Sequence, residues 1–167
     1  DATGHITPEV LSEALTEDTV LLSCQLVNNE IGTVQPVEQL GKLLKAKAPK
    51  ALFHIDAVQG LCRVRLTPKK WNCDLMSVSG HKIGAPKGIG ALYVKKGLRL
   101  PPLTFGGGQE RGMRPGTEAV PNIAAFAKAC EIRMAHFDED YAHVLELADY
   151  LKQQVVTELP DAVINGE

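Results

Sequence analysis

The stretch Asp74–Lys82 reads Asp-Leu-Met-Ser-Val-Ser-Gly-His-Lys, an apolar run that ends in a cluster of polar side chains. The apolar part predicts a buried strand over 74–78. Upstream, Ala51–Ile55 predicts a second strand, which ends at Asp56. In open α/β sheets, ligands bind at the carboxyl ends of the strands. The sequence therefore predicts an α/β fold that brings Asp56 to the same edge of a sheet as Ser79, His81 and Lys82.

Strands and helices alternate on both sides of this stretch. Thr7-Pro8 predicts the N-cap and first position of a short helix. Further elements are expected as a strand at 19–24, a helix from Val37 that ends near Ala48-Pro49, and a strand at 90–94 running away from the site. Apolar residues at helical spacing from Ile123 to Leu159 predict one long helix or two with a bend, and 161–166 resembles the entry to a further strand. The alternation is typical of a mostly parallel sheet covered on both faces.

Composition narrows the class of protein. The chain has 167 residues, of which 44% are hydrophobic and 23% charged, and its formal net charge is −2. These values are typical of globular proteins. The sequence contains no stripe of basic residues, so nucleic acid binding is not indicated. No run approaches the roughly 20 apolar residues of a membrane helix, and the N-terminus does not resemble a signal peptide. Because the chain opens Asp1-Ala2-Thr3-Gly4 without a methionine, an internal fragment or a processed product is expected.

The four cysteines are Cys24, Cys62, Cys73 and Cys130, and none forms a Cys-x-x-Cys pair. A zinc or iron–sulfur site built by this chain alone is therefore not expected. We expect all four to be reduced and structural in a cytoplasmic protein.

The polar cluster points to pyridoxal phosphate chemistry. A lysine amine can form a Schiff base with the cofactor aldehyde, and a carboxylate can keep the pyridine nitrogen protonated. Lys82 and Asp56 would supply these two groups. The alternatives are an ordinary solvated lysine and an aspartate that starts the turn after a strand. His54 is expected to support the strand end rather than to reach the ligand.

The run Phe105–Thr117 reads Phe-Gly-Gly-Gly-Gln-Glu-Arg-Gly-Met-Arg-Pro-Gly-Thr. It is not a Walker loop, because no lysine and hydroxyl follow at the required spacing. It also lacks the strand–Gly-x-Gly-x-x-Gly–helix context of a dinucleotide site. A flexible surface loop is the plain alternative.

Together with Asn28-Asn29-Glu30-Ile31-Gly32, these motifs resemble the NifS/IscS-like cysteine desulfurases, a branch of the class V aminotransferase superfamily with the fold-type I pyridoxal phosphate architecture. The resemblance covers essentially the whole chain. It implies that Lys82 holds pyridoxal 5'-phosphate and then shifts protons, and that Asp56 pairs with the pyridinium nitrogen. It places Gln59 and Asn29 near the phenolic oxygen, although spacing alone does not separate Asn28 from Asn29.

The same resemblance gives the remaining contacts. Ser79 and His81 would hold the phosphate, and Thr117 would reach across a homodimer interface to the partner's cofactor phosphate. Gly80 and Gly84 would let the backbone approach the cofactor closely. Arg111 and Arg114 would support the loop or its partner contacts. No metal site is implied.

The chain also departs from the family pattern. Complete members are considerably longer and have a further phosphate loop, a ring-stacking histidine, a mobile loop with the sulfur-accepting cysteine and a substrate-binding arginine. None of the four cysteines occupies a matching context. The resemblance implies that 1–117 is the second half of the cofactor-binding large domain and that 118–160 is a long linking helix or helices. Residues 161–167 would begin a truncated small domain that is otherwise missing.

The implied function of the parent protein is a cysteine desulfurase, which converts L-cysteine to L-alanine and passes sulfur to an enzyme persulfide. A sulfur-acceptor or scaffold protein would then use it for iron–sulfur clusters or thiolated tRNA. A selenocysteine lyase-like or other class V enzyme is the alternative within the enzymes. A catalytically inactive fragment that retains only the fold and dimer contacts is the alternative outside them.

Overall fold

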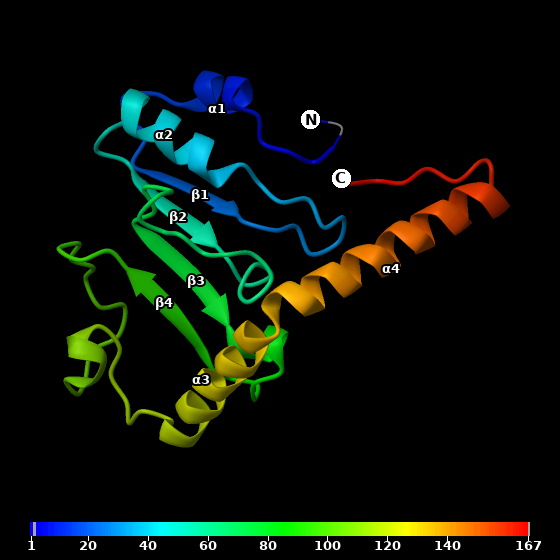
Figure 1. Cartoon of the computed structure of the whole chain (residues 1–167). Helices are drawn as coiled ribbons and strands as arrows, with labels where there is room; N and C mark the ends of the chain where they lie inside the picture. The colour runs from blue at the N-terminus through cyan, green and yellow to red at the C-terminus, as the bar shows by residue number, and fades with distance from the viewer. Residues whose placement is uncertain (2, 167) are drawn as a thin grey trace.

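The structure, a computed structural model, describes residues 1 and 3–166. At its centre is a four-stranded sheet in the order β1-β2-β3-β4 (Figure 1), formed by Leu21–Gln25, Leu52–Asp56, Leu75–Ser79 and Gly90–Val94. The first three strands are parallel, and β4 is antiparallel to β3. The predicted α/β class and the mostly parallel sheet are confirmed, as is the opposite direction of β4.

Two helices precede and follow β1, and both begin where the sequence predicts. Helix α1 spans Pro8–Ala14, and the hydroxyl of Thr7 accepts a hydrogen bond from the amide of Val10 at 3.3 Å. This side-chain cap satisfies one of the free amides of the first turn. Helix α2 spans Val37–Lys47 and has Ala48 as its C-cap. Proline at position 49 disfavours helical geometry for the preceding residue, Ala48, which is where α2 ends.

The core lies between α2 and one face of the sheet. Leu40 and Leu44 of α2 and Phe53 and Ile55 of β2 are fully buried. Successive side chains of a strand point to opposite faces, so Asp56 belongs to the face away from this core. Within the described residues, that second face is only partly covered, because Leu21 and Leu92 remain about half exposed at 49% and 52%. The prediction of a sheet covered on both faces is therefore wrong for the part of the chain that the structure describes.

The segment between β2 and β3 explains part of this difference. It contains turns rather than a crossover helix. Trp71 in this segment packs its backbone carbonyl against Gly41 of α2. The connection therefore adds to the face that α2 already covers and supplies no helix over the Asp56 face.

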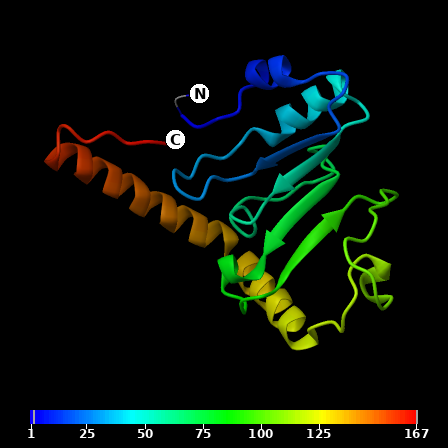
Figure 2. The same ribbon diagram turned by 180° about the vertical axis from the view of Figure 1, so that it is seen from behind.

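Helices α3 (Val120–Ala135) and α4 (Phe137–Glu158) follow the sheet and are separated at His136, whose φ and ψ are −111° and 15°. The prediction of two helices with a bend is confirmed over the single long helix. In Figures 1 and 2, α4 extends away from the sheet. Residues 161–166, expected to be the entry to a further strand, form no strand in the described part of the chain. Gly166 lies against Ile31.

Candidate cofactor site

The carboxyl ends of the parallel strands line a small, open cavity of about 220 Å³. Asp56 comes from the end of β2, Gln59 from the turn after it, and Asn29 from the loop after β1. Lys82 reaches the same cavity from the short 3₁₀ turn η1, Gly80–Ile83, which directly follows β3. The structure therefore brings together four of the residues that sequence reasoning selected, three of them from loops that are distant in the chain.

Asp56 stabilises a local turn and also lines the cavity. Its Oδ1 accepts a hydrogen bond from the amide of Val58 at 2.9 Å. This contact fixes the turn that carries Gln59, as expected of an aspartate after a strand. The same side chain lines the cavity. The turn-forming and ligand-binding interpretations of Asp56 are therefore compatible.

The structure separates the two asparagines that sequence spacing could not. The Oδ1 of Asn28 accepts hydrogen bonds from the amides of Glu30 and Ile31, at 2.8 and 3.0 Å. Its carbonyl oxygen is therefore committed to the turn after β1. Asn29, in contrast, is exposed and lines the cavity. This geometry favours Asn29 as the residue available to a ligand.

The end of β3 and the turn η1 place Ser79, His81 and Lys82 within four residues. Ser79 ends β3, and its hydroxyl lies 2.8 Å from Nδ1 of His81. Because this bond uses one ring nitrogen, Nε2 is the ring atom left for another partner. Neither side chain is among those that line the 220 Å³ cavity, although both flank Lys82 in the chain. A hydroxyl and an imidazole at this position fit an anionic group beside the cavity.

The glycines around Lys82 have local structural causes. A side chain at Gly80 would lie 2.8 Å from Cγ2 of Ile89, and Gly84 has a φ of +90°. Gly80 is needed because the turn packs against Ile89, and Gly84 because few other residues adopt its left-handed conformation. Close approach of a ligand is not required to explain either glycine.

Thr117 lies apart from the cavity. It is exposed on the loop between η2 (Gln109–Gly112) and α3. The side chain of Gln109 organises this loop by accepting a hydrogen bond from the amide of Gly116 at 3.1 Å. Glu110 and Arg111 both have positive φ, 48° and 59°. The structure therefore does not bring Thr117 to the site of its own chain, and its predicted role in a partner's site stays a prediction.

Comparison with known proteins places this geometry in a family. The sequence profile described as aminotransferase class-V matches residues 1–167. The chain belongs to the class-V aminotransferase family. It is 46% identical to "Cysteine desulfurase 2" of Trichormus variabilis over 166 residues, which are 99% of this chain and 41% of that protein.

Solved structures agree with this assignment. A "NIFS-LIKE PROTEIN" superposes with a TM-score of 0.90 at 39% identity, covering 94% of this chain and 43% of that one. A structure titled "SspA in complex with cysteine" superposes with a TM-score of 0.74 at 42% identity, covering 78% of this chain and 38% of that one. This class-V aminotransferase chain thus spans about 40% of the length of the curated relatives it matches.

Sequence reasoning missed some of the residues that line the cavity, namely Gln25, Val27 and Val58. Gln25 is the most informative, because it extends β1 one residue beyond the predicted strand and pairs in register with Asp56. A polar residue after an apolar strand, at the same edge as Asp56, was the available signal. His54 behaves as predicted: its ring bonds the hydroxyls of Ser23 and Ser77, at 2.7 and 2.8 Å, and does not line the cavity.

The cysteines of this class-V chain are free thiols, and none lines the cavity in the described part of the chain. Burial raises the pKa of Cys24 and Cys73 to about 11 each. Burial and the neighbouring Cys130 thiol raise the pKa of Cys62 to about 11 as well. Since the thiolate is the nucleophilic form, Cys24, Cys62 and Cys73 are poor nucleophiles at neutral pH. Their environments fit the structural role expected from the sequence.

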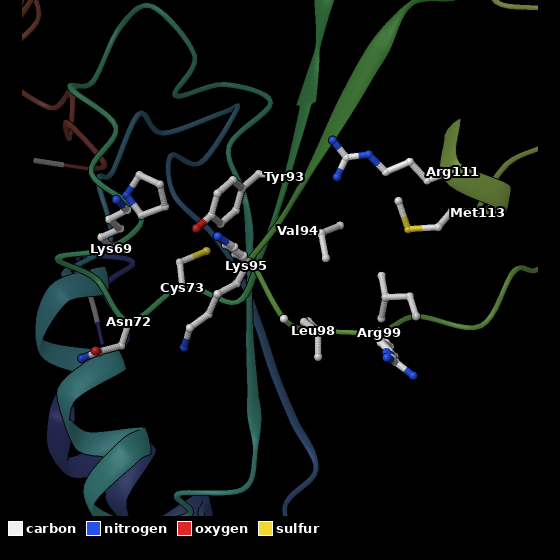
Figure 3. A pocket seen from close by; sticks show the side chains of 14 residues that line it. Lys69, Asn72, Cys73, Tyr93, Val94, Lys95, Leu98, Arg99, Arg111 and Met113 are labelled. Atoms are coloured by element: carbon white, nitrogen blue, oxygen red, sulfur yellow. The ribbon is translucent and has the colours of Figure 1, made fainter. Parts of the chain in front are cut away.

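A larger cavity of about 1150 Å³ lies elsewhere (Figure 3). It includes Val94, which pairs with Leu75 at the end of β3 opposite Ser79. Its lining contains the cations Lys69, Lys95, Lys96, Arg99 and Arg111. Because the strands separate it from Lys82, it is not part of the Asp56 cavity.

Among the described residues, no group of three or more histidine, cysteine, aspartate or glutamate side chains could hold a metal ion. In the same part of the chain, none of the helices has the length and apolar character needed to cross a membrane.

Proposed function

We propose that this chain is the cofactor-binding portion of a pyridoxal phosphate-dependent cysteine desulfurase. The observation that carries the proposal is the convergence of Asn29, Asp56, Gln59 and Lys82 on one cavity. The relatives named cysteine desulfurase, at 43 to 46% identity, support the choice of reaction. The parent protein would take L-cysteine, release L-alanine and pass the sulfur on as an enzyme persulfide.

The donor set of the site fits pyridoxal 5'-phosphate. An aldehyde requires an amine, which Lys82 offers, and a ring nitrogen that must stay protonated requires a carboxylate, which Asp56 offers. The amides of Asn29 and Gln59 can donate to an oxygen on the ring. Ser79 and His81 offer a hydroxyl and an imidazole beside Lys82 for a phosphate. When bound, the cofactor supplies the electron sink for cleavage at the substrate's α-carbon and β-carbon.

The residues of this chain have separable tasks in this proposal. The Lys82 amine holds the cofactor. Once the substrate amine has released it, the Lys82 amine carries a proton to and from the α-carbon of the substrate. The Asp56 carboxylate accepts the hydrogen bond of the ring N–H. Because none of the described cysteines lines the cavity, we assign none of them the task of taking the sulfur.

We extend the proposal to the assembly and its surroundings. Leu103 and Phe105, on the loop that leads to Thr117, are 96% and 88% exposed. Apolar side chains this exposed favour an interface, which supports the predicted homodimer in which Thr117 contacts the partner's cofactor. A sulfur-acceptor or scaffold protein would be the second partner, and the free thiols fit the predicted cytoplasmic location.

The test is the intact denatured mass after incubation with pyridoxal phosphate and reduction with borohydride. We expect one cofactor adduct in the wild-type protein and none in Lys82→Ala. Lys87→Ala is the matched control, because Lys87 is an exposed lysine in the same β3–β4 connection and does not line the cavity. An adduct that persists in Lys82→Ala, or is lost in Lys87→Ala, would contradict the assignment of Lys82.

Substrate choice is tested on the whole protein. Alanine release from L-cysteine is expected to require Lys82. Release from L-selenocysteine alone, with none from L-cysteine, would overturn the desulfurase in favour of a selenocysteine lyase-like enzyme. An adduct without alanine release from either substrate would favour a catalytically inactive member.

A further inference from the structure

The turn that carries Lys82 has little internal support. It is a four-residue 3₁₀ turn, Gly80–Ile83, closed by hydrogen bonds from the amides of Gly84 and Ala85 to the carbonyl of Gly80. The last carbonyls of a helical turn have no donor within the turn itself. The carbonyls of Lys82 and Ile83 must therefore be satisfied from outside if the lysine backbone is to stay fixed.

Arg63 supplies a donor to the first of these carbonyls. Its Nη2 donates to the carbonyl oxygen of Lys82 at 2.9 Å. Its Nη1 donates to the carbonyl oxygen of Gln59 at 3.2 Å. One planar guanidinium therefore joins the backbones of two residues that line the Asp56 cavity. Charge-assisted hydrogen bonds of this kind are about twice as strong as neutral ones, and only arginine offers this fork of donors.

The segment that holds Arg63 is itself tightly folded. The amides of Arg63 and Val64 donate to the carbonyl of Gly60 at 3.0 and 2.9 Å. A side chain at Gly60 would lie 2.5 Å from Cδ2 of Leu26, so the turn packs directly on the residue that follows β1. Cys62, immediately before Arg63, has a φ of +56°. A non-glycine residue persists in this region only when its surroundings determine the backbone, so the position of Arg63 is well defined.

A second arginine approaches the same turn from another element. Nε of Arg133, on α3, lies 3.5 Å from the carbonyl oxygen of Ile83. This is a long contact, and Arg133 also faces Asp140 at 3.7 Å. The two guanidinium groups thus face consecutive carbonyls at the end of the Lys82 turn. Cations at this position also complement the partial negative charge of a helical C-terminus.

We propose that Arg63 is a positioning residue for the cofactor lysine: it ties the backbone of Lys82 to that of Gln59 and so fixes where the Lys82 amine enters the cavity. The inference deepens the proposed function, on which it rests for the role of Lys82. Arg63 does not line the Asp56 cavity, and its effect on the reaction is through Lys82 and Gln59.

The first experiment needs no cofactor. In the whole protein without pyridoxal phosphate, hydrogen–deuterium exchange is measured for the peptide that covers Gly80–Gly88 in wild type and in Arg63→Gln. Loss of a charge-assisted bond predicts about ten-fold faster exchange of the amides that close the turn. Arg63→Lys keeps the charge but can reach only one carbonyl. Its amide exchange rate should therefore lie between those of wild type and Arg63→Gln.

Arg65→Gln is the matched control. Arg65 belongs to the same connection but bonds Asp138 at 2.6 Å and lies over the ring of Phe137 at 4.6 Å, and among the described residues it makes no hydrogen bond to the Lys82 turn. Its substitution removes the same charge and should leave exchange at Gly80–Gly88 unchanged. Equal exchange in wild type and Arg63→Gln, or a rise spread over the whole sheet, would overturn the proposal.

The second experiment follows the lysine itself. At saturating pyridoxal phosphate, borohydride trapping on Lys82 is expected to be about ten-fold slower in Arg63→Gln, partly rescued in Arg63→Lys, and unchanged in Arg65→Gln. Unchanged trapping in Arg63→Gln would overturn the positioning role. If wild-type protein forms no adduct, the proposed function fails, whereas the exchange measurement still decides whether Arg63 fixes the turn.

Discussion

At the scale of single residues, Asp74, at the end of β3 opposite the site, shows how charge is used structurally. It is buried, and its two oxygens bond Lys45 of α2 and Lys95 beyond β4, at 2.8 and 3.0 Å. The amide of Phe53 donates to it at 3.0 Å. Burial alone would raise the pKa of Asp74, but these three hydrogen bonds outweigh burial and lower it. One carboxylate thus connects α2, β2, β3 and β4.

A prediction at this scale concerns pH. Because the pKa of Asp74 is lower in the folded protein, its stabilisation is present above the unfolded value of about 3.9 and is lost as pH falls through the folded pKa. We expect Asp74→Asn to reduce the free energy of unfolding by about 2–3 kcal/mol at pH 7 and by less below pH ~3. Urea unfolding at both pH values measures this. An equal loss at both would contradict it, and Asp18→Asn, on the exposed turn before β1, is a suitable control.

Some residues of the candidate site could be predicted from the sequence, and others could not because their role depends on contacts in the folded chain. Lys82 and Asp56 could be selected from the sequence as candidate site residues because the amine and the carboxylate each follow a predicted strand. Arg63 was not, because its importance depends on a carbonyl that lies 19 positions along the chain. Asn28 and Asn29 have the same side chain, and only the hydrogen bonds of the folded turn distinguish them. A sequence shows the type of each residue, but it does not show hydrogen bonds to backbone atoms that are distant in the chain or set by the folded turn.

At the scale of elements, α2 shows how closely helix and connection are packed. A side chain at Gly41 would collide with the carbonyl of Trp71. We expect Gly41→Ala to lower the free energy of unfolding by about 1–3 kcal/mol, although alanine is the better helix former. Denaturant unfolding provides the measurement. Lys42→Ala, at an exposed neighbouring position of the same helix, should change it little, and stabilisation by Gly41→Ala would contradict the packing.

Elements were predicted best where a local signal exists. The Thr7-Pro8 start of α1 and the Ala48-Pro49 end of α2 are examples, because caps and prolines act within one turn. The strand entry expected at 161–166 depends on a partner strand rather than on a local signal. Ala162–Ile164 has a suitable apolar character, but a strand forms only when a neighbour offers its edge, and sequence does not show which edges are free.

At the scale of the whole molecule, the most unusual surface is that of α3 and α4. Neither helix contains a buried residue. Large apolar side chains on α4 remain exposed, among them Val144 at 62%, Tyr150 at 62% and Leu151 at 62%. Contiguous apolar surface of this kind marks an interaction site or promotes association.

We therefore expect the 167-residue chain to associate in solution. Replacing Val144 and Leu151 by lysine should reduce association while leaving the unfolding midpoint of the sheet nearly unchanged, because neither side chain is part of the core. Sedimentation velocity and thermal unfolding give the two measurements. Lys152→Ser, on the same helix, serves as a control for altered charge. A monomeric wild-type chain would contradict this expectation.

The antiparallel pairing of β4 bears on the order in which the site assembles during folding. Ser79 pairs with Gly90, so the Lys82 turn is closed by a local hairpin. Asp56 joins it only when β2 and β3 pair in parallel across a longer connection. Short loops close faster and at a smaller entropic cost than long ones. The lysine is thus expected to be preformed while its carboxylate partner arrives late, and capture of a cofactor would report completion of the sheet rather than initiate it.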